Sequence, residues 1–148
     1  MKLTTRVLIL FLLAGSILAA GNFERSIPLP RNGEARLGWS SGGCTVRSVS
    51  LQNYPKSDDI DKARRKDPDD KSWLWWNFHV ENRGDSKCRI HLWVDVYDKA
   101  GRVAKSSDRS DTVDAHKSDD NIRVSTRMRT LDIADSPKAH IRADIGPK

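Results

Sequence analysis

Aromatic side chains gather in one short stretch of the sequence, SWLWWNFHV at residues 72–80, which holds three of the five tryptophans of the chain. Flat aromatic rings on an open surface can stack on sugar rings or bases, and large apolar patches also mark protein interfaces. Because alternate side chains of a strand point to opposite faces, Trp76 can serve a core while Trp73 and Trp75 point the other way. Whatever covers these two rings is therefore the main clue to function.

A second strand-like run, residues 87–97, follows residues 73–81 after the short segment NRGDS. This spacing predicts a hairpin in which Gly84 or Asp85 supplies the positive φ of the turn. A register that sets Trp76 opposite Leu92 makes one face of the hairpin wholly apolar, which indicates the core face. The opposite face is polar except for its aromatic rings. The predicted ligand- or partner-binding residues on that face are Trp73, Trp75, Trp93, Tyr97, His79, His91 and Arg89.

Three interpretations of this predicted aromatic face are open. It can be covered by the polar N-terminal segment, by residues 56–71 or by another sheet. It can dock on a protein of the cell envelope or on a second copy of the chain. It can also stack on carbohydrate such as cell-wall glycan, with Arg89 and Lys87 holding acidic groups.

Residues suited to metal binding or catalysis are sparse. His79 and His91 would lie diagonally on the predicted face, close enough for a copper or zinc ion, but two histidines without a third ligand do not predict a metal site. The Asp clusters of residues 56–71 lack the spacing of a calcium loop. No serine lies in a nucleophile elbow and no carboxylate pair can be assigned to a cleft. We expect a protein that is not an enzyme and has no cofactor.

Two cysteines, Cys44 and Cys88, are present. The first twenty residues contain Lys2 and Arg6, then an apolar run and small residues, the order of a secretory signal peptide. An exported chain enters an oxidising compartment, so the cysteines are predicted to form one disulfide. We expect a periplasmic or secreted protein with no membrane span in the mature chain.

Removal of residues 1–20 takes away two basic residues and no acid, which lowers the formal net charge from +6 to +4. The remaining residues 21–148 have the size of a single domain. The basic residues of NIRVSTRMR are predicted to lie outward, with one more in HIRADI: Arg123, Arg127, Arg129 and Arg142. Such a stripe can hold a polyanion or simply be a solvated face. It has no interleaved aromatic residues of its own, so no nucleic-acid partner is predicted.

Strand-like segments dominate the sequence beyond residue 34, and turn-like stretches separate them at short intervals. In CTVRSVSLQNY the apolar positions change from even to odd numbers, which indicates a bulge or a crossing between sheets. In DDIDKARRK acids precede bases ahead of Pro68, which favours a short helix near residues 58–66. The pattern predicts an all-β, antiparallel, immunoglobulin-like β-sandwich.

The run from residue 80 to residue 103 resembles the FxLYD type of bacterial exported domain, a small immunoglobulin-like sandwich. Asn82 ends the first strand, and Gly101 occupies the turn in YDKAGRV. The apolar-x-apolar-Tyr-Asp signature corresponds to Val94, Val96, Tyr97 and Asp98, with Val in place of Phe and of Leu. The resemblance covers roughly residues 72–146 and implies a binding or scaffolding module without catalytic residues. We therefore expect a non-enzymatic binding module that docks on an envelope protein or on itself, with glycan binding as the alternative.

Overall fold

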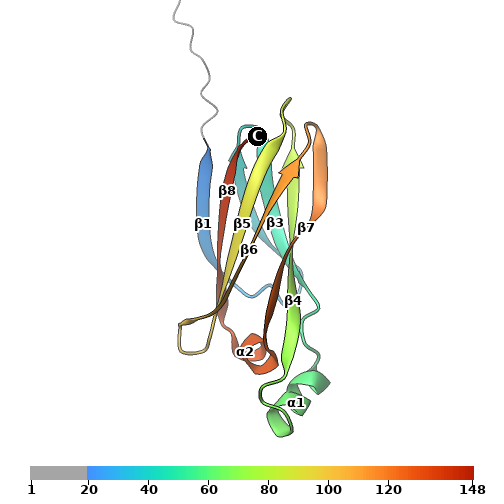
Figure 1. The fold of residues 1–148 in the computed structure, drawn as a ribbon, viewed down its shortest axis with the longest axis vertical. Helices are drawn as coiled ribbons and strands as arrows, with labels where there is room; N and C mark the ends of the chain where they lie inside the picture. Colours follow the sequence, from blue (N-terminus) through green and yellow to red (C-terminus); the bar gives the residue numbers. More distant parts are fainter. Residues whose placement is uncertain (1–19) are drawn as a thin grey trace, which may run out of the picture.

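The computed structural model describes residues 20–148, apart from the side chains at positions 120 and 121. The predicted signal peptide lies outside the described residues except for Ala20. Eight strands form two antiparallel sheets that pack face to face, with two short helices at one end (Figure 1). The elements are β1 (Gly21–Pro28), β2 (Glu34–Ser41), β3 (Cys44–Gln52), α1 (Ser57–Arg65), β4 (Lys71–Asn82), β5 (Cys88–Tyr97), β6 (Val103–Val113), β7 (Lys117–Arg129), α2 (Thr130–Asp135) and β8 (Lys138–Pro147).

The two sheets have four strands each. Sheet A has the order β1-β8-β5-β6, and sheet B has the order β2-β3-β4-β7. The pairing of β4 with β7 and of β5 with β8, one pair in each sheet, matches that of the B and E strands and the C and F strands of an immunoglobulin sandwich. The predicted all-β, antiparallel sandwich is confirmed, as is the short helix, which spans Ser57–Arg65. No helix among residues 20–148 is both long enough and apolar enough to cross a membrane.

Alternation along the strands builds the core. In β4 the side chains of Leu74, Trp76 and Val80 are fully buried, while Trp73, which precedes them and points to the other face, is exposed. The even-numbered side chains of β5 from Ile90 onward are also fully buried and face them from sheet A. Each large apolar side chain removed from water in this way stabilises the fold by about 1.5–3 kcal/mol. The predicted bulge in β3 is confirmed, between Val46 and Ser48.

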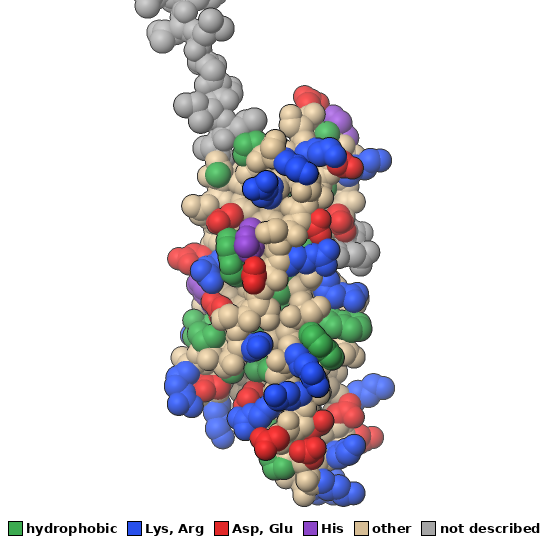
Figure 2. Space-filling model, in the orientation of Figure 1, with side chains coloured by type: hydrophobic (Ala, Val, Ile, Leu, Met, Phe, Trp, Pro, Cys, Tyr) green, Lys and Arg blue, Asp and Glu red, His purple; other side chains and the backbone are tan. Residues whose placement is uncertain are grey.

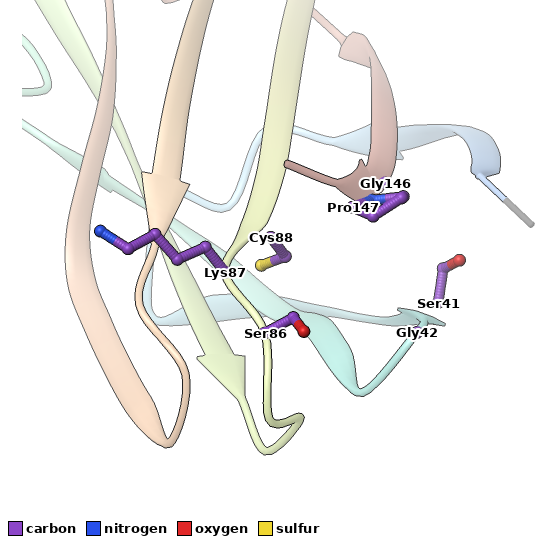
Figure 3. Close-up of a pocket in the computed structure, with 7 residues that line it drawn as sticks. All are labelled: Ser41, Gly42, Ser86, Lys87, Cys88, Gly146 and Pro147. Atoms are coloured by element: carbon purple, nitrogen blue, oxygen red, sulfur yellow. The ribbon is translucent and has the colours of Figure 1, made fainter. Parts of the chain in front are cut away.

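The disulfide joins the two sheets. Cys44 is the first residue of β3 in sheet B and Cys88 is the first residue of β5 in sheet A, and both side chains are buried. The predicted disulfide is confirmed. Beside Cys88 lies a small hollow that Ser41, Lys87 and Gly146 help to line (Figure 3). Its volume of about 20 Å³ suits a single water molecule and no larger ligand.

The predicted hairpin between residues 73–81 and 87–97 is wrong. β4 pairs with β3 and β7, whereas β5 pairs with β6 and β8, so the two strands face each other across the core. The segment between them is an arch that crosses from one sheet to the other. In a hairpin and in an arch alike, alternate side chains of the two strands point toward the core. The apolar pattern in the sequence therefore does not distinguish the two connections. Neither Gly84 nor Asp85 has a positive φ.

Asn82 holds the arch together from within. Its side chain is 1% exposed, and its Nδ2 donates to the carbonyl oxygens of Ser86, Val113 and Asp114 at 2.9, 3.1 and 3.1 Å. Its Oδ1 accepts a hydrogen bond from the backbone N–H of Gly84 at 3.0 Å. One buried side-chain amide thereby forms hydrogen bonds with both the arch and the end of β6. These bonds fix the position at which the chain leaves sheet B.

The arch also packs against the turn between β2 and β3. Gly43 has a φ of +82°, and a Cβ atom there would lie 2.8 Å from Cα of Gly84. The N–H of Arg83 donates to the carbonyl of Gly43 at 2.9 Å. A side chain at position 43 would therefore push the two loops apart.

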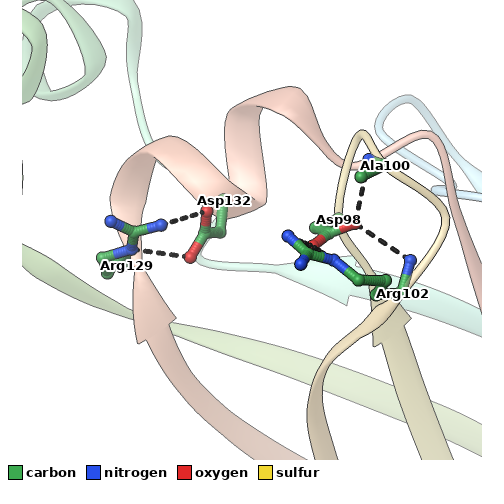
Figure 4. Close-up of polar contacts among 5 residues, drawn as sticks. All are labelled: Asp98, Ala100, Arg102, Arg129 and Asp132. Carbon is green, nitrogen blue, oxygen red and sulfur yellow. Dashed lines mark hydrogen bonds and ion pairs between the residues drawn. The ribbon is translucent and has the colours of Figure 1, made fainter.

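At the other end of the sandwich Asp98 closes the turn between β5 and β6. Its Oδ1 accepts hydrogen bonds from the backbone N–H groups of Ala100 and Arg102, both at 2.9 Å (Figure 4). Gly101 has a φ of +79°, a conformation that glycine adopts without strain. Contacts within residues 98–102 thus stabilise the turn.

Three carboxylates at the strand ends have pKa values below their ordinary ones. The hydrogen bond from Arg83 lowers the pKa of Glu81, and the N–H of Arg102 does the same for the pKa of Asp98. A hydrogen bond from Lys87 lowers the pKa of Asp114. A carboxylate whose pKa is lower when folded contributes stability above its unfolded pKa and loses it as the pH falls.

We therefore expect the free energy of unfolding to decrease as the pH falls below about 4.5, through the ordinary range of these carboxyl groups. Urea unfolding followed at neutral pH and at a series of acidic values measures this decrease. Asp98→Asn keeps an oxygen for the two N–H groups but has no charge to titrate, so its stability should vary less with pH. An unfolding free energy that stays constant through this range would contradict the role of these carboxylates.

Candidate binding face on sheet B

The predicted aromatic face is divided between opposite sides of the sandwich. Trp73, Trp75 and His79 point outward from β4 in sheet B. The other members of the predicted set point outward from β5 in sheet A: Arg89, His91, Trp93 and Tyr97. The prediction that these side chains form one surface is wrong because the strands that carry them do not pair.

The same division removes the shared metal site considered for His79 and His91, since the two histidines lie on different sheets. Among the side chains of residues 20–148 that the structure describes, no group of three or more His, Cys, Asp or Glu residues is arranged to hold a metal ion.

On the outer face of sheet A, Trp93 is already in contact with its own neighbours. Its ring stacks on that of His91 with centroids 3.8 Å apart and planes inclined by 7°. The guanidinium of Arg142 lies 5.3 Å from the Trp93 ring and pairs with Asp95 at 3.5 Å. His91 in turn contacts Asp108 at 2.8 Å. Trp93 therefore forms part of an internal network.

The rest of the outer face of sheet A is similar. His140 lies 3.1 Å from Glu24 and 2.9 Å from Ser26, and the Tyr97 ring lies 5.0 Å from the ammonium of Lys138. The space-filling view shows acidic, basic and histidine side chains intermingled on the side where sheet A lies in front (Figure 2). This face has little unbalanced charge with which to attract a partner.

Sheet B has a different outer face, and we call its aromatic part the Trp–Arg face: Trp73, Trp75, Arg123 and Arg127. Trp73 is 46% exposed, and only Val103 joins it as an exposed large hydrophobic side chain among the described residues. The register of β4 with β7 sets Trp73 opposite Arg127 and Trp75 opposite Ser125. Two indoles and two arginines from neighbouring strands therefore share one surface.

The arginines lie against the indole rings. The guanidinium carbon of Arg123 is 4.3 Å from the centroid of the Trp75 ring, and that of Arg127 is 5.9 Å from the centroid of the Trp73 ring. Such cation–π contacts contribute about 0.5–1 kcal/mol each at exposed sites. The Nε of Arg123 also donates to Oδ1 of Asn77 at 3.2 Å. These contacts hold Arg123 in place while its terminal nitrogens remain available.

These two arginines differ from Arg129, the next outward residue of β7. Arg129 makes two hydrogen bonds to Asp132, at 2.8 and 3.0 Å, which raise its pKa above the ordinary value (Figure 4). Within the described part of the chain, neither Arg123 nor Arg127 forms an ion pair with a carboxylate. The Trp–Arg face is therefore a local excess of positive charge.

Two hollows are lined partly by residues of sheet B. One is lined by Glu34, Arg36, Arg47, Ser48 and His79, farther along the outer face of sheet B, and measures about 540 Å³. Its polar groups are partly engaged, since Ser48 donates to Glu34 at 2.7 Å and Arg47 pairs with Glu81 at 3.3 Å.

The other hollow, of about 250 Å³, lies between the turn at residues 98–102 and α2. Its charged groups include the Asp98–Arg102 and Arg129–Asp132 pairs, so most of its charge is neutralised from within. The Trp–Arg face remains the better candidate.

The sequence revealed the arginine stripe but no aromatic residues within it. The structure supplies them from β4, because residues 71–77 pair with residues 123–129. The basic residues of β7 point outward as predicted, since the alternate residues Ile122, Val124, Thr126 and Met128 are buried. What was missed is a pairing between segments that lie far apart in the chain.

The sequence matches no known protein-family model and no curated protein.

Proposed function

We propose that the protein is an exported, non-enzymatic binding module that docks on a protein of the cell envelope, or on a second copy of itself, through the Trp–Arg face. The observation behind this proposal is the pairing of exposed Trp73 with Arg127 across two strands. Tryptophan and arginine are the residues most enriched among those that dominate the binding energy of protein interfaces. Export is supported by the inter-sheet disulfide and by the signal-like order of the first twenty residues.

Glycan binding is less well supported than protein docking. Stacking on a sugar ring requires an open aromatic face. The guanidinium of Arg123 already lies over the Trp75 ring, and the rings that would have enlarged the platform, Trp93 and Tyr97, lie on the other sheet.

The FxLYD-type resemblance remains part of the proposal. Val94 and Val96 of the signature are buried, Asp98 closes the following turn, and Gly101 has the positive φ of a turn glycine. These features support a domain of that type, for which a binding role without catalysis is the expectation.

Photo-crosslinking in intact cells tests the docking proposal. A photoreactive amino acid replaces Ser125, which is exposed on β7 directly opposite Trp75, so both indoles and both arginines are retained. We expect an ultraviolet-dependent adduct at this position, and a yield lowered by roughly tenfold or more in Trp73→Ala, because a tryptophan anchor contributes about 2 kcal/mol or more.

The same reagent at Tyr97, on the outer face of sheet A, is the matched control and should give no specific adduct. Equal yields with and without Trp73, or an adduct at Tyr97 alone, would contradict docking through the Trp–Arg face. Mass spectrometry of the adduct distinguishes an envelope protein from a second copy.

A further inference from the structure

We propose that the partner docks on the Trp–Arg face with an extended segment that carries two acidic side chains four positions apart. This inference rests on the proposed function, because it concerns the same surface, and it adds the chemistry and spacing of the partner. On the opposing outer face, on sheet A, His91, His140 and Arg142 lie against carboxylates of the same chain.

The charge of the partner follows from the arginines. Arg123 and Arg127 form no ion pair with any carboxylate that the structure describes, although the chain has acidic residues in abundance. A guanidinium presents a planar fork of donors that matches the two oxygens of a carboxylate. Each fork is partly immobilised by an indole ring, so less side-chain freedom is lost when the partner binds.

The spacing of the partner follows from the strand that holds the arginines. Four residues along β7 separate them, a distance of about 13 Å at 3.3 Å per residue. A partner in extended conformation has the same rise, and its side chains at positions i and i+4 share a face. Its intermediate residue i+2 would lie over Ser125, a small side chain between the two cations.

Arg129 does not provide a third cation for an acidic residue of the partner. Its guanidinium is already occupied by Asp132 in a two-bond contact. The motif is therefore limited to two carboxylates, and Trp73 and Trp75 provide the apolar contact beside them.

The partner lies on the face of the sheet and does not add a strand to its edge. On the free side of β7, Nη1 of Arg109 in β6 donates to the carbonyl of Arg123 at 3.3 Å. The hydroxyl of Thr126 donates to Ser107 of β6 at 3.1 Å. β6 thus contacts part of this edge, whereas Ser125 and Arg127 on the outer face are exposed.

Fluorescence anisotropy of labelled synthetic peptides tests the proposal with the mature protein. The first peptide has two glutamates at i and i+4 in a background of serine and threonine. The second has them at i and i+3, so that they lie on opposite faces of an extended chain, and the third has glutamine at both positions. We expect binding of the first peptide, about tenfold weaker binding of the other two, and weakening by salt.

Matched protein variants assign this binding to the face. Arg123→Gln/Arg127→Gln should lower the affinity for the first peptide by about tenfold, because exposed ion pairs contribute up to about 1 kcal/mol each. Arg89→Gln/Lys138→Gln makes the same charge change on sheet A and should leave the affinity unaltered. Unfolding midpoints confirm that both variants remain folded.

Three results would overturn the proposal: no binding of the first peptide, equal binding of all three peptides, or equal affinity of the two variants. Binding of polygalacturonate with no response to the first peptide would identify an acidic glycan as the ligand instead. If the crosslink at Ser125 forms while the peptide fails to bind, docking through this face stands and only the acidic-segment inference is lost.

Discussion

The double variant Cys44→Ala/Cys88→Ala is expected to be less stable than the parent protein by about 4 kcal/mol. The bridged residues are separated by 44 positions, so the disulfide closes a long loop and removes much of the conformational freedom of the unfolded chain. Because it joins sheet A to sheet B, it limits how far the two halves of the core can separate during unfolding. Equilibrium unfolding in urea measures the difference.

The parent protein with its disulfide reduced is the natural comparison for this variant, because it has no cross-link but retains both sulfur atoms. The two should have similar stability, and both should show a larger dependence of unfolding free energy on urea, since an unlinked chain exposes more surface. A loss smaller than about 1 kcal/mol would show that loop closure contributes little to the stability of this fold.

Asn82→Ala is expected to lower the free energy of unfolding by about 3 kcal/mol. The substitution removes the donor for three carbonyl oxygens and the acceptor for the N–H of Gly84, in a place where the asparagine side chain is 1% exposed. Buried polar groups left without partners cost about 1–3 kcal/mol each, and water entering the vacated space offsets part of this.

Asn82→Asp gives a sharper test of the same contacts. It preserves the shape of the side chain but sets a carboxylate oxygen against the three carbonyls, so it should destabilise the protein at least as much as alanine does. Asn32→Ala, in the exposed loop between β1 and β2, is the control and should change stability very little. Unfolding midpoints that are the same for the three variants would exclude an organising role for Asn82.

The sequence predicted which side chains point inward better than it predicted which strands are neighbours. Leu74, Trp76 and Leu92 are in the core as expected, because alternation reports the face of a strand directly. Whether β4 and β5 pair or face each other depends on the path of five loop residues, and Asn82 sets that path through bonds to residues more than thirty positions away. The local sequence pattern carries no information about such long-range contacts.

The sequence predicted residues of the candidate site separately but did not predict that they lie together. Trp73 and the stripe through Arg127 were both identified, but their association requires the long-range pairing of β4 with β7. The grouping of Trp73 with Trp93 failed for the same reason that the hairpin failed.

Three elements departed from the predicted segments. β6 runs unbroken over Val103–Val113 without an alternating apolar pattern, and its positions opposite the core residues of β5 are polar, such as Lys105 and Ser107, because it lies at the edge of sheet A. β1 was expected only as a polar lead and is the other edge strand of that sheet. The six-residue helix α2 has too few residues to show a helical period.

The pairing of β1 with β8 has a consequence for how the molecule is made. Among the described residues, β1 is the first strand of the chain and pairs only with β8, the last strand, with Gly21 opposite Ile145. Because the chain is synthesised from its N-terminus, β1 has no strand partner in sheet A until β8 has been made. During this time charged side chains such as Glu24 and Arg25 make pairing with other strand edges less favourable. Sheet A can therefore close only after β8 has been synthesised, and until then the polar side chains of β1 protect the chain against aggregation.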